Sequence, residues 1–321
     1  MTIPRMMLML TLTLGAAVAA MVAQAASAQT NAPPANLRLA VIPVTNYAPL
    51  AVARDKGFFA QENLNVTWTN VSQGAIAVEA VFGGSAEIGG SSIFEPIVAR
   101  SNGLDIVFIA ASARIRSNPP DNSGVVVRRN DAIQSAKDLA GKRISAGLIN
   151  SVNYAHMREW LQRNGTDPNS AQFLEIPFPQ MADALFQNRL DAVWNVEPFL
   201  TFMLKSGNAR VLSYPYQENV PRMDITGYLA KESWVKANPD VARRFRRAID
   251  RATNYLINAG KEERDDFVVK YTGAKPEVVA AMNLPEYTAE FNVPSLKANL
   301  EIAVRQKLAK PFDLDAMIWK P

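Results

Sequence analysis

The sequence predicts an α/β fold of two lobes, each built on a mainly parallel sheet flanked by helices. Short apolar segments alternate with helical ones, an order that favours parallel strands covered by helices on both faces. The same order begins again after Pro119-Pro120. The 321 residues, 48% of them hydrophobic and 20% charged, are enough to supply the cores of two modest domains.

The first lobe is predicted from the segments that precede Pro119. A helix opens at Pro49, because proline is favoured at the first helical position, and it stops at Gly57. A second helix stops at Gly83-Gly84. The predicted strands are residues 37–42, 65–71, 87–89 and 106–111, and the predicted helices are residues 49–56, 75–82 and 93–100.

The second lobe follows the first crossing, and the region from residue 239 onward reads as mostly helical. Its predicted strands are residues 124–128, 144–146, 173–176, 191–194 and 211–213, and its predicted helices are residues 152–163 and 181–186. Crossings at residues 117–122 and 221–228 assign residues 37–118 and 228–321 to lobe 1 and residues 119–227 to lobe 2. Two such lobes leave a ligand cleft between them that closes by hinge motion.

The first 28 residues have the pattern of a secretory signal peptide. Arg5 precedes an apolar run from Met6 to Val22, and Ala26-Ser27-Ala28 offers a small-residue cleavage site. A membrane anchor is the alternative, but the run is shorter than the ~20 residues that a span needs. We therefore expect a signal peptide at 1–28, a flexible lead-in at 29–36, and export to the periplasm.

Composition argues against several classes of function. There is no cysteine, which excludes disulfides, thiolate chemistry and lipid attachment at a cysteine. Net charge is +4, but basic and acidic residues are interleaved, so we expect solvated helix faces and no nucleic-acid partner. The single histidine, His156, has no partner in sequence for a catalytic triad. We expect no catalytic residues, no metal site and no cofactor.

Several phrases of the sequence resemble one known family. They are residues 49–59 with 62–66, Gly83-Gly84-Ser85-Ala86-Glu87-Ile88-Gly89, Asp138-Leu139-Ala140-Gly141-Lys142, and Asp191-Ala192-Val193-Trp194-Asn195-Val196-Glu197-Pro198-Phe199. In this order they are similar to phrases of the sulfonate, nitrate and taurine solute-binding proteins of ABC transporters. Asn63 stands where that family commonly has glycine, and Glu87 where it commonly has aspartate.

The resemblance implies a periplasmic-binding-protein fold and a protein without catalytic activity. Such a protein captures a small organic anion or zwitterion and delivers it to ABC permease subunits in the inner membrane, and we expect it to be a monomer. Sulfonates, taurine, nitrate, aromatic acids and pyrimidines all remain possible ligands. Two alternatives stay open: an enzyme related to pyrimidine-precursor synthases, which share the fold, and a binding module that feeds a sensor kinase.

The strongest candidates for anion binding are two strand-to-helix turns. Ser91 and Ser92 follow one predicted strand, and Ser151 and Asn153 open a predicted helix in the other lobe. Helix N-termini present unpaired N–H groups to anions. Plain helix capping is the alternative. Facing turns would hold a sulfonate or carboxylate from both sides.

Further candidates come from loop tips and strand ends. Asn46, Tyr47 and Gln73 follow predicted strands on the cleft side. Arg114 could bind an anion through two parallel hydrogen bonds, with a salt bridge near the hinge as the alternative. Trp194 could stack on the ligand or lie in the core. Glu197 could bind a ligand amine, pair with an arginine, or cap the helix that follows.

Overall fold

The structure is a computed structural model that describes residues 33–321, and residues 36–321 form one compact unit. The predicted signal peptide lies outside the described residues. The first strand already begins at Ala35, inside the predicted lead-in. No helix within the described part of the chain combines the length and the apolar character that a membrane span requires.

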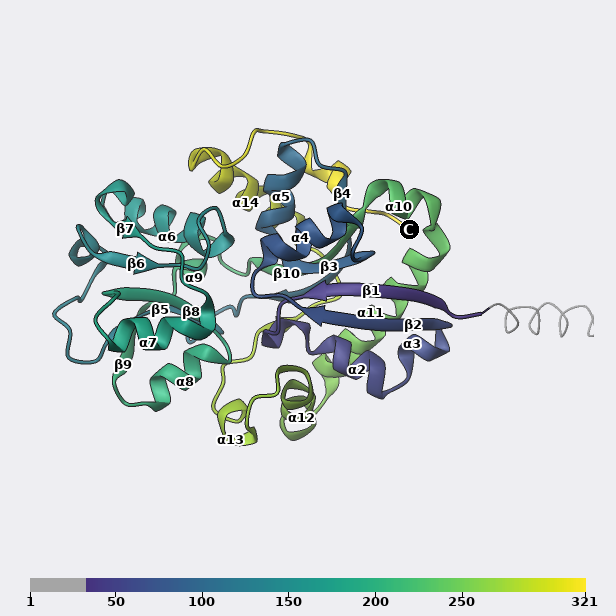
Figure 1. Ribbon diagram of the computed structural model, residues 1–321, viewed down its shortest axis with the longest axis horizontal. Coiled ribbons are helices and arrows are strands. Elements are labelled where there is room, and N and C mark those ends of the chain that lie inside the picture. Colours follow the sequence, from purple (N-terminus) through teal and green to yellow (C-terminus); the bar gives the residue numbers. More distant parts are fainter. Residues whose placement is uncertain (1–32) are drawn as a thin grey trace, which may run out of the picture. The chain divides into compact units, whose positions relative to one another are not determined.

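The first sheet has six strands in the order β11-β4-β10-β3-β1-β2. Its strands are β1 (Ala35–Val41), β2 (Leu64–Asn70), β3 (Ile88–Ser92), β4 (Ile106–Arg114), β10 (Asp224–Lys231) and β11 (Glu286–Tyr287). Strand β3 is parallel to β1, whereas β10 is antiparallel to both β3 and β4. The strand that returns from the other lobe therefore fills the middle of this sheet (Figure 1).

The second sheet has five strands in the order β7-β6-β8-β5-β9. Its strands are β5 (Ser123–Arg128), β6 (Arg143–Ser145), β7 (Gln172–Phe173), β8 (Ala192–Val196) and β9 (Ala209–Ser213). Strands β6, β7 and β8 are parallel, and β5 is antiparallel to β8 and β9. All strands but β5 thus run the same way.

Both sheets confirm the predicted α/β class, but each is mixed. In the first sheet β10 and the short edge strand β11 run against β1, β3 and β4, and in the second sheet β5 runs against the others. Strand β5 is the first strand after Pro119-Pro120, and β10 is the first strand to rejoin the first sheet after the strands of the second. The division into two lobes at residues 118/119 and 227/228 stays a prediction. Strand β10 begins at Asp224, ahead of the second of these boundaries.

Helices cover both sheets. Those outside the second lobe are α2 (Pro49–Asp55), α3 (Phe58–Gln61), α4 (Gly74–Gly83), α5 (Phe94–Ser101), α10 (Glu232–Ala237), α11 (Pro239–Asn258), α12 (Lys261–Thr272), α13 (Pro276–Val279) and α14 (Val293–Arg305). Those of the second lobe are α6 (Val152–Arg163), α7 (Met181–Phe186), α8 (Phe199–Lys205) and α9 (Pro215–Asn219). As the sequence predicts, Pro49 opens α2, and Gly84 ends α4 in the left-handed conformation with φ 78°.

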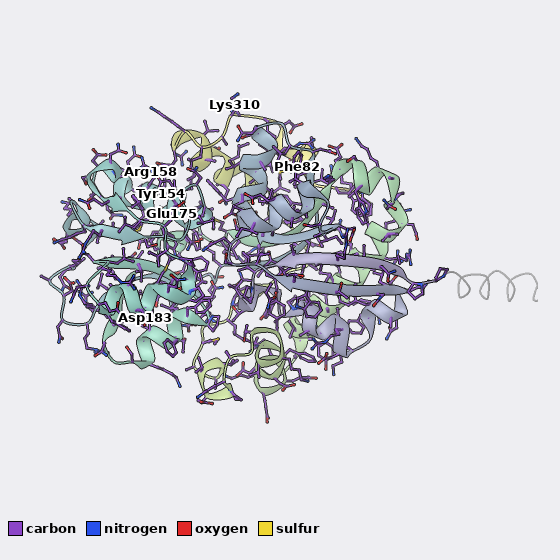
Figure 2. The ribbon with its side chains drawn as sticks, in the orientation of Figure 1. Phe82, Tyr154, Arg158, Glu175, Asp183 and Lys310 are labelled. Atoms are coloured by element: carbon purple, nitrogen blue, oxygen red, sulfur yellow. The ribbon has the colours of Figure 1, made fainter. Side chains whose placement is uncertain are left out.

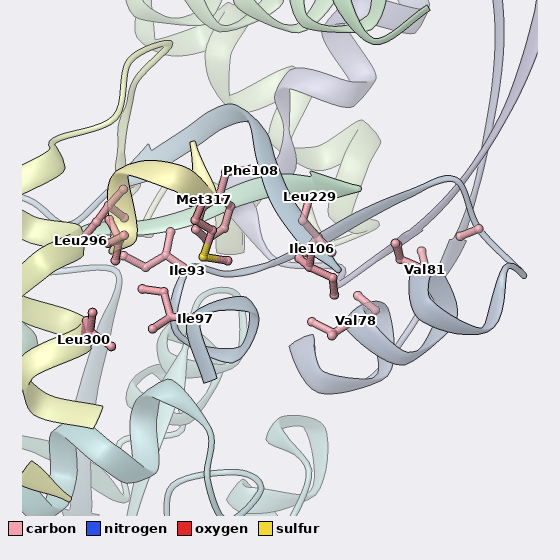
Figure 3. Packing of buried hydrophobic residues seen from close by; sticks show 14 residues of the cluster. Val78, Val81, Ile93, Ile97, Ile106, Phe108, Leu229, Leu296, Leu300 and Met317 are labelled. Carbon is pink, nitrogen blue, oxygen red and sulfur yellow. The ribbon is translucent and has the colours of Figure 1, made fainter. Parts of the chain in front are cut away.

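The core of the first lobe lies between the sheet and helices α4, α5 and α14. Ile97 of α5 packs with Phe108 of β4 and Leu296 of α14, and Met317 near the C-terminus closes the same cluster (Figure 3). Burial of such side chains stabilises the fold by about 1.5–3 kcal/mol each. This packing fixes α5, whose first turn reaches the space between the lobes.

Helix α6 is held against the second sheet by aromatic contacts. The Tyr154 ring lies edge-on to Phe173 of β7 with centroids 4.9 Å apart. The Arg158 guanidinium lies 5.6 Å from the Tyr154 ring centroid (Figure 2). These contacts orient α6 so that its N-terminus faces α5 of the first lobe, where Val152 bonds to Glu95.

Candidate functional site

A cavity lies between the two sheets, and residues from both lobes line it. It holds about 490 Å³ of space free of protein atoms, part of which is open to solvent, and small-molecule sites commonly lie in such clefts between domains. The polar residues of its lining are Asn46, Gln73, Ser92, Glu95, Asn122, Ser123, Asn153 and Thr226. Four of the predicted ligand-binding residues are thus brought together there: Asn46, Gln73, Ser92 and Asn153.

Buried polar atoms at this cavity lack a hydrogen-bond partner among the described residues. They include Gln73 Nε2, Ser123 Oγ and Asn153 Nδ2, on side chains that are only 3–4% exposed. Leaving a buried polar group unpaired costs roughly 1–3 kcal/mol, so such groups normally have partners. Gln73 belongs to the first lobe and the other two to the second. The arrangement can bind polar atoms of a ligand from both sides.

Asn46 is fixed where the chain crosses between the lobes. The Asn122 Nδ2 group donates a hydrogen bond to Asn46 Oδ1 over 3.0 Å. The Ser112 hydroxyl donates to the Asn46 carbonyl oxygen over 2.6 Å. The Asn46 side chain therefore links the loop after β1 to Asn122, the residue that precedes β5.

Glu95, which the sequence reasoning missed, is the most distinctive residue of the lining. Its Oε1 accepts a hydrogen bond from the Val152 backbone N–H over 3.3 Å. Its Oε2 accepts bonds from the Ser92 hydroxyl and, over 3.5 Å, from the Ser91 hydroxyl. Burial raises the pKa of Glu95, and these donors oppose that rise. The Glu95 carboxylate thus accepts hydrogen bonds from both of the turns that were predicted to bind an anion.

Tyr47 and Ser91 lie behind the cavity wall. Tyr47 is fully buried, and its hydroxyl donates to the Ser91 carbonyl oxygen over 2.6 Å. That hydroxyl also lies 3.2 Å from the Gly227 carbonyl oxygen, so it links the segment before α2 to β3 and β10. These residues support the wall. Direct ligand contact by Tyr47 or Ser91 stays a prediction.

Arg114 lies outside the described lining and forms the salt bridge that was its alternative interpretation. Its Nε donates to Asp224 Oδ1 over 2.7 Å, and the Asp224 side chain is 1% exposed. The Nη2 group donates to the Glu290 carbonyl oxygen over 3.2 Å. Because these bonds occupy the guanidinium, the geometry does not favour the predicted ligand contact.

Ser151 and Trp194 also lie outside the described lining. Ser151 caps α6, since its hydroxyl oxygen accepts the Tyr154 N–H over 3.3 Å. Trp194 is fully buried, with its ring centroid 4.5 Å from that of Tyr216. Tyr216 itself lines the cavity. Trp194 therefore supports an aromatic wall that the sequence reasoning did not identify.

Glu197 is buried and bonded within the protein. Its carboxylate accepts hydrogen bonds from the Thr201 N–H at 3.0 Å, the Thr201 hydroxyl at 2.7 Å and the Asn283 N–H at 3.3 Å. Burial raises the pKa of Glu197 to about 7. The residue caps α8, which was one of its alternative interpretations, and ligand contact stays a prediction.

His156 is buried away from the cavity lining. Its Nε2 lies 3.0 Å from Asn299 Oδ1 of α14, and its Nδ1 lies 3.4 Å from Asn219 Nδ2. Burial lowers the pKa of His156 to about 4, so the ring is neutral near pH 7. A buried, neutral histidine bonded to two amides is a structural residue that joins α6 to α14.

An apolar groove continues from the cavity past Glu95. Gln73 and Glu95 line both spaces, and the groove is otherwise walled mainly by apolar side chains of α4, α5 and the loop before α6. Glu79 of α4 is exposed at this groove. The groove gives Glu95 a second approach from outside the cavity.

Comparison with known proteins identifies a family that this chain matches. The family model described as "NMT1/THI5 like" matches residues 44–263. The taurine-binding periplasmic protein of Escherichia coli (strain K12) is 26% identical over 274 residues, which cover 83% of this chain and 78% of that protein. A 4-amino-5-hydroxymethyl-2-methylpyrimidine phosphate synthase of Saccharomyces cerevisiae, THI11, is 18% identical, with 67% and 64% covered.

The crystal structure of the periplasmic aliphatic sulphonate binding protein SsuA from Escherichia coli has a similar fold. The TM-score is 0.73 at 19% sequence identity, with 89% of this chain and 98% of that chain covered. At this identity the likeness shows a shared fold, that of the periplasmic binding proteins. The predicted fold class is confirmed.

Proposed function

We propose, from the premise that the chain belongs to the NMT1/THI5-like family, that it is the solute-binding component of an ABC importer. It captures a small organic anion or zwitterion by hinge closure and passes it to permease subunits in the inner membrane. In this proposal the chain reaches the periplasm with a signal peptide cleaved after Ala28. It acts as a monomer whose lobes are residues 37–118 with 228–321, and residues 119–227.

One observation carries the proposal: unpartnered buried polar atoms of both lobes face one small cavity. A solute that satisfies Gln73 on one side and Ser123 and Asn153 on the other does so only when the lobes are together. Its binding energy therefore favours the closed state over an open one. The proposed contacts are Asn46, Gln73, Ser92, Glu95, Asn122, Ser123, Asn153, Tyr216 and Thr226.

The proposal excludes catalysis by this chain, although synthases occur among its relatives. A general base must reach the proton that it removes. His156 is buried, neutral near pH 7 and outside the described lining of the cavity. Retention of the solute without chemical change is the simpler use of such a site. A binding protein that reports to a sensor kinase would close around its solute in the same way, and would differ from an importer component only in its partner protein.

The test is a thermal-shift screen followed by calorimetry on the mature protein. The panel contains alkanesulfonates, taurine, carboxylates, nitrate and aminopyrimidines. A true ligand at a hundred times its Kd should add about 2.7 kcal/mol of stability, and mass spectrometry should recover it unchanged. Conversion of a bound solute would contradict the proposal, as would the absence of any stabilising solute. Uptake of the identified solute by vesicles that carry the permease separates import from sensing.

A further inference from the structure

Glu95 gives the described lining of the cavity an acidic group without a basic side chain beside it. Among its described lining residues Glu95 is the acidic one, and that lining contains no lysine, arginine or histidine. Within the described chain Glu95 makes no salt bridge with a basic side chain. An ionised carboxylate without a counter-ion is costly to bury. Burial disfavours the ionised form of Glu95 and raises its pKa, and a cationic group of a bound solute would favour that form again.

Glu95 also fills the place where an anionic group of the ligand was expected. The Ser92 hydroxyl and the Val152 N–H, one from each lobe, both donate to it. An anion that approached these donors would meet the carboxylate and be repelled. The two turns are thus already neutralised by the chain itself, and they cannot serve a sulfonate or nitrate without displacing Glu95.

The carboxylate still has room for a ligand donor. Two carboxylate oxygens offer about four acceptor positions, and the hydrogen bonds from the Ser92 hydroxyl and the Val152 N–H, with the long 3.5 Å contact from the Ser91 hydroxyl, leave this capacity only partly used. These bonds also hold the group in a fixed orientation at the cavity wall. A preorganised acceptor binds a cationic N–H group more strongly than a neutral donor.

The remaining lining offers the opposite chemistry. The amide nitrogens Gln73 Nε2 and Asn153 Nδ2 are donors without a partner in the described chain. They can be satisfied by acceptor oxygens of a ligand. Gln73 and Gly74 adjoin Glu95, since a Cβ at Gly74 would lie 3.3 Å from Glu95 Cδ. Donors and carboxylate therefore belong to one small site.

We infer that Glu95 is the specificity-determining residue of the cavity, and that it selects a solute with a primary ammonium or similar N–H cation and an acceptor group at its other end. This inference rests on the proposed function and names its substrate class. Inorganic anions and organic anions without an amine are disfavoured, because no basic side chain of the described lining would hold them beside Glu95.

The test uses solutes paired so that each pair differs only in the amino group. The pairs are taurine with ethanesulfonate, β-alanine with propionate, and 4-(aminomethyl)benzoate with 4-methylbenzoate. Calorimetry on the wild-type protein should show at least tenfold tighter binding of the amine in the pair that fits the cavity. The variant Glu95→Gln should lose most of that preference. Glu79→Gln, a control at an exposed carboxylate of the groove, should keep it.

The outcomes separate the two proposals. Equal or tighter binding of the amine-free member would overturn the inference and leave the solute-binding function standing. An unchanged amine preference in Glu95→Gln would also overturn it. If no member of any pair bound the wild-type protein while another solute of the screening panel did, the inference would fail and the solute-binding function would stand; binding of no solute at all would sink both. The wild-type comparison needs no variant, so it remains decisive if Glu95→Gln does not fold.

Discussion

The backbone N–H of Val152 donates a hydrogen bond to Glu95 Oε1 over 3.3 Å, and this bond joins the first residue of α6 to α5 of the other lobe. Val152 stands at the first helical position, where the N–H has no partner within the helix. The bond therefore links the lobes at the edge of the cavity without disturbing either helix.

Replacing Val152 by proline should remove this bond and leave α6 intact. Proline is favoured at the first helical position, and the preceding Ser151 has φ −77° and ψ 168°, which proline accepts. We expect ligand affinity to fall about three- to tenfold because Glu95 loses a positioning donor worth roughly 1 kcal/mol. Val152→Ala keeps the N–H and is the control. Equal affinities in the two variants would contradict this prediction.

Truncation of the unpartnered amides should weaken binding without weakening the fold. For Gln73→Ala and Asn153→Ala we expect about tenfold lower affinity, since each loses a hydrogen bond to the ligand worth about 1–1.5 kcal/mol. The free energy of unfolding without ligand should stay the same or rise, because a buried unsatisfied group is removed. Calorimetry and urea unfolding measure the two quantities. Asn258→Ala, at the exposed end of α11, should change neither.

Loss of Arg114 should cost stability rather than binding. Arg114→Met leaves Asp224 buried beside a neutral side chain, and breaking a buried ion pair in this way costs about 3 kcal/mol. The double variant with Asp224→Asn should recover part of that loss, as urea unfolding of all three variants would show. A ligand affinity that falls more than threefold in the folded Arg114→Met protein would restore its predicted role in ligand binding.

Glu197 should make stability fall as pH rises through its titration range. Burial raises its pKa from 4.5 to about 7 in the folded protein. The folded state therefore holds the proton over a range in which the unfolded state has released it. The favourable contribution is fully present below pH 4.5 and is lost as pH rises through about 7, with a total of about 3 kcal/mol. Wild-type stability minus that of Glu197→Gln, measured from pH 4.5 to 8, should show this decline; a flat difference would contradict it.

Local signals explain the parts of the fold that the sequence predicted. Pro49 and Gly57 bound α2 and the turn that follows it, and the apolar run from Ile106 marks β4. The place of β10 between β3 and β4 has no such signal, because pairing across more than a hundred residues depends on tertiary packing. For the same reason the sequence does not predict the Arg114–Asp224 salt bridge, whose residues lie 110 positions apart.

The candidate site was predicted in part for a similar reason. Polar residues directly after strands, such as Asn46 and Gln73, do reach the cavity because strand ends of an α/β sheet meet there. Glu95 sits between Phe94 and Pro96 in an otherwise apolar stretch, and nothing nearby in sequence shows that it faces Val152. Its one local signal is an acidic side chain in the first turn of a helix that directly follows Ser92.

The insertion of β10 also bears on the order in which the molecule can assemble during synthesis. Every strand of the second sheet lies between Ser123 and Ser213 in one continuous stretch. The first sheet lacks its central strand until Lys231 has emerged. When the chain emerges from the ribosome N-terminus first, every strand of the second sheet is therefore available before the first sheet can be completed, because β10 follows all of them in the chain.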